Sequence, residues 1–238
     1  MELTELERMI NEREGYVSLA FPALMRKVYV WMALALAITG VTAFGVANSP
    51  NIMIAIYSNR AVFWGLIIAE LALVFVVSGM INRLSLTTAT LLFTLYSVLN
   101  GVVLSSIFVI YSGTSIAKVF FITAGTFAAM AVYGYTTKRD LSTMGRLMFM
   151  GLIGLIIASI VNLFIKSSGL DLILSYIGVI VFVGLTAWDT QKIKQMLAMQ
   201  EDIDEGAQKI ALVGALSLYL DFINLFLYLL RIFGGSRD

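Results

Sequence analysis

The sequence predicts an all-α polytopic membrane protein with seven transmembrane helices, because three features of the chain agree. Of its 238 residues, 60% are hydrophobic and 13% are charged, whereas an ordinary soluble domain has roughly 45–50% apolar and about 25% charged residues. Seven apolar runs reach the length of about 20 residues that a membrane-spanning helix needs. Most of the polar stretches between these runs contain only a few residues.

The short polar stretches set how neighbouring spans are arranged. Connections such as Asn48–Asn51 and Lys138–Asp140 are so short that the helices on either side must pack as antiparallel hairpins. The link at about 190–207 is longer and charged, so we expect a solvated loop or an extension of the sixth helix. The spans themselves are expected at 28–47, 61–80, 86–110, 116–136, 144–165, 171–190 and 208–231.

The distribution of positive charge favours a cytoplasmic N-terminus. In that orientation 11 of the 16 Lys and Arg residues lie on the cytoplasmic side, where the positive-inside rule places them. Residues 1–27 then form a cytoplasmic N-terminal segment, and residues 28–233 form the transmembrane domain. Within the first segment, Met1–Ile10 is expected to be either a short interfacial helix or a frayed terminus. The compact chain is typical of a bacterial inner (cell) membrane protein.

Composition excludes many kinds of chemistry. The chain has no Cys and no His, which removes disulfides, thiolate catalysis and the commonest general base and metal ligand. A net charge of +1 provides no basic surface for nucleic acid. The sequence has no Gly-rich phosphate loop, and the acidic run 201–206 does not fit a calcium-loop spacing. We therefore expect neither an enzyme nor a cofactor, and any proton or metal chemistry must use carboxylates.

Two aspartates are the best candidates for an ion or proton site. Asp221 lies near the middle of the span 208–231, where a carboxylate costs about 2.5–3.5 kcal/mol on insertion scales. A purely structural hydrogen bond to a neighbouring helix is the alternative. Asp189 ends the span 171–190 and, taken alone, is a helix-end residue that could pair with Lys192 or Lys194. Because consecutive helices usually lie side by side, we expect both carboxyl groups to share a proton or to bind a metal cation such as calcium.

Other polar residues in or near the spans extend this hypothesis. Glu70 lies in the middle of the second span, and it either takes part in conduction or makes a structural hydrogen bond to Asn100, Asn162 or Asn224. Arg83 follows the second span and could reach an acid at the cytoplasmic end of the sixth. Snorkelling to lipid headgroups is the commoner fate of such an arginine.

Two motifs near the C-terminus resemble a known family. The segment Leu216–Arg231, which reads LSLYLDFINLFLYLLR, resembles the terminal signature of the Bax inhibitor family, the transmembrane Bax-inhibitor-motif proteins. The sequence WDTQ at 188–191 is similar to that family's pattern of an aromatic residue, an Asp and a nearby Gln. This resemblance implies two three-helix layers around a central seventh helix, and it implies a pH-sensitive calcium leak in which Asp189 and Asp221 are the paired aspartates.

The resemblance also implies a latch that closes the protein. In the family's closed form an arginine after the second helix pairs with the aspartate of the sixth. Arg83 is the nearest match, and it would pair with Asp189. The local sequence departs from the family pattern, because Met80–Arg83 contains one cation in place of a basic cluster.

Three functions remain open from the sequence. The first is a calcium leak channel or proton-linked calcium exchanger, with calcium as the transported ion and with protons and the lipid bilayer as partners. The second is an intramembrane aspartyl protease. Proteases of that kind contain the motifs Tyr-Asp and Gly-x-Gly-Asp, whereas this chain reads Trp188-Asp189 and Leu218-Tyr-Leu-Asp221 at the similar positions. The third is a non-conducting regulatory protein that contacts other membrane proteins.

Overall fold

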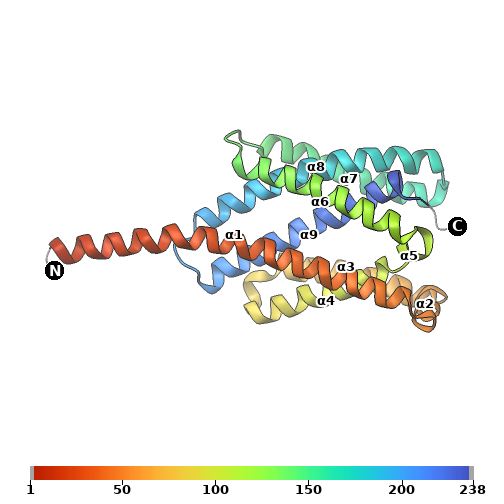
Figure 1. The fold of residues 1–238 in the computed structure, drawn as a ribbon, viewed down its shortest axis with the longest axis horizontal. Coiled ribbons are helices and arrows are strands. Elements are labelled where there is room, and N and C mark those ends of the chain that lie inside the picture. Colours follow the sequence, from red (N-terminus) through yellow and green to blue (C-terminus); the bar gives the residue numbers. More distant parts are fainter. Residues whose placement is uncertain (1–2, 236–238) are drawn as a thin grey trace.

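The structure is a computed structural model that describes residues 3–235, with side chains described from residue 20 onward. In this part of the chain nearly all residues are helical (Figure 1). The elements are α1 (Leu3–Ala47), α2 (Pro50–Tyr57), α3 (Arg60–Gly79), η1 (Ile81–Arg83), α4 (Leu86–Leu104), α5 (Ile107–Ile110), α6 (Gly113–Thr136), α7 (Ser142–Ile165), α8 (Ser168–Ala198) and α9 (Glu205–Phe233).

The predicted number of membrane spans is confirmed. Seven segments of the described chain are long and apolar enough to cross a bilayer. Each corresponds to one run found in the sequence. They are Ala20–Ala47, Arg60–Gly79, Leu86–Ile110, Gly113–Thr136, Ser142–Ile165, Ser168–Ala198 and Glu205–Phe233.

The N-terminal part of the chain differs from the prediction. Helix α1 runs from Leu3 to Ala47 without a break at residue 28, and its membrane-length part begins at Ala20. A separate short helix over Met1–Ile10 is not formed, because from Leu3 onward these residues belong to the same long helix. Met1 and Glu2 lie outside the described residues, as do the side chains up to residue 19, so the apolar face predicted there is not described.

One of the two alternatives for the link at about 190–207 is confirmed, and two other details differ for local reasons. Helix α8 continues to Ala198, so half of that link is an extension of the sixth span. The short helix α2 was not predicted, and it starts at Pro50, a residue whose fixed φ suits the first helical position. The span expected at 86–110 is interrupted at Ser105 and Ser106, where α4 ends and α5 begins.

The helices form two layers on either side of α9, as the family resemblance implied. Helices α1, α3 and α4 pack in one layer and α6, α7 and α8 in the other, while α9 packs against α1, α4, α6 and α8 (Figure 1). In the apolar 18-residue stretch of α9, 67% is buried, which is the largest share among the seven spans. Helix α9 is therefore the centre of the bundle.

Aromatic side chains join α9 to both layers. Tyr219 packs edge-on against Phe93 of α4, with ring centroids 5.8 Å apart. Phe222, one turn further along α9, packs against Phe127 of α6 with centroids 5.5 Å apart. Contacts of this geometry stabilise a pair by about 0.5–1.5 kcal/mol beyond the burial of its surface.

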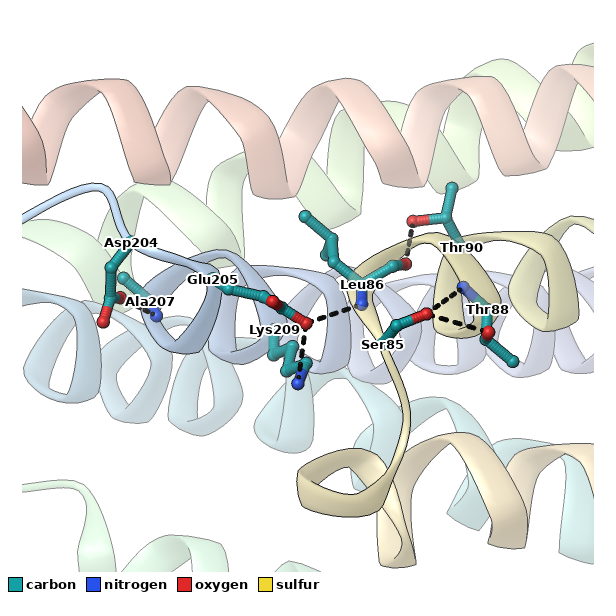
Figure 2. Close-up of polar contacts among 8 residues, drawn as sticks. All are labelled: Ser85, Leu86, Thr88, Thr90, Asp204, Glu205, Ala207 and Lys209. Atoms are coloured by element: carbon teal, nitrogen blue, oxygen red, sulfur yellow. Dashed lines mark hydrogen bonds and ion pairs between the residues drawn. The ribbon is translucent and has the colours of Figure 1, made fainter.

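A polar contact ties the start of α9 to the start of α4 (Figure 2). Glu205 Oε1 accepts a hydrogen bond from the backbone N–H of Leu86 at 3.0 Å and pairs with Lys209 Nζ at 2.9 Å. Ser85 and Asp204 cap the same two helices with their own side chains. The Glu205 carboxylate thus satisfies a free N–H group at the N-terminus of a helix far away in the sequence.

Candidate functional site: an acidic cavity inside the bundle

One cavity brings together the polar residues singled out in the sequence. It has a volume of about 800 Å³ and lies between α3, α4, α7, α8 and α9. Its walls are mostly apolar. The polar side chains that line it include Glu70, Asn100, Asp189, Asp221 and Asn224.

Asp221 is the most enclosed of the acids in this cavity. Helix α9 is buried on nearly all sides, and the Asp221 side chain is only 4% exposed. Its Oδ2 atom has no hydrogen-bond partner among the described residues. A buried carboxyl oxygen without a partner is costly in a low-dielectric interior. A structural hydrogen bond to another helix, the alternative considered above, is therefore not made at this oxygen.

Asp189 approaches the same space from α8. It is partly buried, and it lines the same cavity as Asp221. Lys192, one turn further along α8, is also in the lining, and its Nζ lies 5.0 Å from the ring centre of Trp188. This end of the cavity therefore contains both an acid and a cation.

Glu70 is the third acid, and it comes from the opposite layer. It is one of only two buried residues of α3, with 9% of its surface exposed, and its Oε1 atom has no hydrogen-bond partner among the described residues. Asn100 lines the same cavity. Asn100 accepts a hydrogen bond from the hydroxyl of Tyr219 at 3.1 Å, and Thr39 Oγ1 lies 2.7 Å from that hydroxyl. A polar network thus links α4, α9 and α1 through the bundle.

The other two asparagines considered as partners of Glu70 have different roles. Asn162 binds Asp171 at 2.9 Å and the backbone of Ser167, so it closes the α7–α8 hairpin. Asn224 lines the cavity but donates its amide to Leu220 O of its own helix at 2.8 Å.

Arg83 is not brought to the cavity. It lies on η1 with an exposed side chain. Among the described residues the structure contains no ion pair between Arg83 and Asp189. The conformation described here is therefore one without the latch.

One residue near the site has a role that the sequence did not specify. Gln191 follows Asp189 on α8, donates to Arg139 O at 2.8 Å and accepts from the N–H of Leu141 at 2.8 Å. It therefore holds the α6–α7 connection against α8. The motif WDTQ drew attention to Gln191, but its partners are about 50 residues away in the chain, so no local pattern could identify them.

The arrangement offers oxygen ligands without forming a closed metal site. Carboxylate oxygens are the ligands that calcium prefers, and calcium takes about 6–8 of them. In the part of the chain that the structure describes, no three acidic side chains are close enough together to hold one metal ion. Asp189 and Asp221 would supply at most four oxygens, which fits a passing ion better than a tightly held one.

The fold and this cavity define a class: a multi-pass membrane protein with an acidic cavity in the interior of a seven-helix bundle. Comparison with known proteins then gives the family. A family model described as "Inhibitor of apoptosis-promoting Bax1" matches residues 22–238. The chain belongs to this Bax inhibitor family, as the motifs in α8 and α9 predicted.

Relatives in several bacteria match most of the chain. "Inner membrane protein YbhL" of Escherichia coli K12 is 54% identical over 214 residues, which cover 90% of this chain and 92% of that protein. An uncharacterized protein of Borreliella burgdorferi is 50% identical over the same shares of both chains. An uncharacterized membrane protein of Streptococcus pyogenes serotype M6 is 43% identical over 78% of this chain and 80% of that protein.

Proposed function

We propose that the protein is a pH-sensitive calcium leak, either a channel or a proton-linked exchanger, in the inner membrane of a bacterium. The observation that carries this proposal is the convergence of Glu70, Asp189 and Asp221 on one cavity between the two layers. The name of the Escherichia coli relative supports the membrane assigned. The positive charges counted in the sequence support a cytoplasmic N-terminus. The proposal includes no enzymatic activity.

Protons and calcium would compete for the same oxygens. Two carboxylates in a low-dielectric space cannot both be charged cheaply unless a cation lies near them. A proton on Asp189 or Asp221 removes a negative charge, and a calcium ion compensates both charges together. The aspartate pair supplies at most four of the oxygens that calcium prefers, and no three acidic side chains in the described part of the chain are close enough together to hold one ion. An ion would therefore bind weakly enough to leave again, as conduction requires.

The latch would determine whether ions reach these oxygens. In a closed state Arg83 would pair with Asp189, and protonation of Asp189 would weaken that pair and release η1 and α3. Helix α3 is suited to such a movement, because Glu70 and Val77 are its only buried residues. The exposed position of Arg83 described above is the released arrangement in this scheme.

The experiment that tests the proposal uses the full chain in calcium-loaded liposomes. We expect calcium release that depends on pH, and we expect Asp221→Asn to abolish it, because this change removes the charge and keeps the shape. The matched control is Asp171→Asn, an exposed acid at the start of α8 that lies outside the cavity.

The outcomes separate a calcium leak from the other two functions considered. A non-conducting regulatory protein or a protease would release no more calcium than empty liposomes. Release that is unchanged by Asp221→Asn would assign the conduction to another part of the molecule.

A further inference from the structure

The acidic cavity has a side that opens toward the outer surface of the bundle. Helix α3 packs on α4 and α7 packs on α8, but α3 and α7 are not packed against each other in the described part of the chain. Residues from both helices nevertheless line the cavity. Several of these lining residues are also exposed on the outer surface of the bundle, namely Leu71, Phe149, Ile156, Ile160 and Leu163. The cavity is thus a groove between α3 and α7 with an apolar rim and an acidic floor.

Two acids that line this groove have a carboxyl oxygen without a partner. Asp221 Oδ2 and Glu70 Oε1 are both buried, and neither atom has a hydrogen-bond partner among the described residues. Asp221 comes from the central helix α9, and Glu70 comes from α3, one wall of the groove. The lining also contains one cation, Lys192 of α8. A positively charged group bound near the two acids would compensate their charge, whereas a neutral lipid chain would not.

We propose that this groove binds lipophilic cations that arrive from the bilayer, meaning an ammonium group carried on an alkyl chain. The ammonium would lie near Asp221 and Glu70, and the chain would follow the apolar rim along Leu71, Ile160 and Leu163 toward the lipid. The long apolar walls favour an amphiphilic ligand, because they offer surface that only a hydrocarbon chain can cover. This binding site goes beyond calcium conduction and does not depend on it.

Trp188 allows a direct test, because it lines the groove. The chain has three tryptophans, so Trp31→Phe and Trp64→Phe leave Trp188 as the single tryptophan, which can be excited selectively at wavelengths that tyrosine does not absorb. The probe is an alkyl quaternary ammonium that carries a nitroxide, mixed into liposomes that contain the full-length protein. A nitroxide bound in the groove would quench Trp188. A neutral nitroxide amphiphile of the same chain length provides the comparison.

We expect saturable quenching by the cationic probe and only weak, non-saturating quenching by the neutral one. In the same background, Asp221→Asn should weaken the apparent affinity for the cationic probe by about tenfold, the order expected when a charge-assisted contact is lost. If Asp221→Asn impairs folding, Glu70→Gln tests the second acid independently. Asp171→Asn, outside the groove, should have no effect.

Two results would overturn the proposal. Equal quenching by both probes would mean that the groove takes a hydrocarbon chain without regard to charge. Cationic quenching that survives both Asp221→Asn and Glu70→Gln would mean that the acids do not form the site. Quenching is measured without calcium flux. If the protein does not conduct calcium, the quenching result can still be interpreted, and if the cationic probe does not bind, the calcium-release result can still be interpreted.

Discussion

Helices α8 and α3 both contribute an acid to the cavity, but they are held in very different ways. In the apolar 18-residue stretch of α8, 50% is buried. In the corresponding stretch of α3, only 6% is buried. Helix α8 packs against α6, α7 and α9, while α3 packs mainly against α4. Asp189 therefore belongs to a fixed wall of the cavity, and Glu70 to a loosely held one.

Close backbone contacts fix α8 just before Asp189. A Cβ atom added to Gly134 of α6 would lie 2.1 Å from Ala187 O, and one added to Gly145 of α7 would lie 2.2 Å from the Trp188 ring. Neither glycine could carry a side chain without moving its neighbour. By contrast, a Cβ atom on Gly65 of α3 would meet nothing within 4 Å. If the protein gates as proposed, the difference indicates that α3 moves against a rigid α6–α7–α8 layer.

The largest expected effect comes from disturbing the fixed wall. Gly134→Ala places a methyl group against a backbone carbonyl of α8, and this contact can be relieved only by separating α6 from α8. We expect a loss of stability of about 1–3 kcal/mol or more, the range typical of overpacking. It is measured as a lower thermal unfolding midpoint in detergent.

The control for this change is Gly125→Ala, in the same helix and with nothing within 4 Å of the added Cβ. It should be neutral or stabilising by up to about 1 kcal/mol, because alanine favours the helix more than glycine does. Equal midpoints for the two variants would show that α6 and α8 are less closely packed than the geometry requires.

The second prediction compares the movements of the two walls directly. The chain has no native Cys, so spin labels can be placed at the exposed positions Ile68 of α3 and Ile180 of α8 through cysteine substitutions. We expect the distance between these labels to change with pH. A control pair on Ile157 of α7 and Ile180 of α8 should keep its distance, because both helices belong to the fixed layer.

Arg83 variants test whether a latch controls the position of α3 relative to α8. If the latch exists in the closed state, Arg83→Ala should shift the distance between the α3 and α8 labels at neutral pH toward its value in acid and raise the calcium leak. Arg83→Lys should do so less, because the charge is kept while the two-pronged contact is lost. An arginine that only snorkels to lipid phosphate predicts that both variants behave as wild type.

The contrast between walls also shows what could be predicted from the sequence. The seven spans followed from the length of apolar runs, and Asp221 stood out because a mid-membrane carboxylate is costly. Both signals are local. The difference between α3 and α8 is not local, since both helices are long and apolar, and their burial depends on which helices the fold places beside them.

Other details depend on tertiary packing in the same way. Which of three asparagines would lie near Glu70 was left open, because the choice depends on how the helices are turned toward one another. The contact of Glu205 with Leu86 joins residues 119 positions apart, and no spacing rule covers such a contact. The extension of the sixth helix was one of two alternatives for the charged link, because that link has no apolar run to mark where the helix ends; α8 ends at Ala198.

The smallest expected effect lies at the end of α7, in the rigid layer but away from the cavity. Lys166 ends this helix with φ 54° and ψ 40°, and it is the only non-glycine residue with positive φ among the described residues. A left-handed conformation costs most residues about 1–2 kcal/mol, and glycine adopts it freely. Lys166→Gly should therefore raise the thermal unfolding midpoint slightly, by the equivalent of about 1 kcal/mol or less. Lys166→Asn removes the same charge and tolerates this conformation better than lysine, so it should give a smaller gain. If Lys166→Gly lowered the midpoint instead, the strain at this turn would be compensated by contacts of the lysine side chain, and the α7–α8 hairpin would be held by more than Asn162 and its partners.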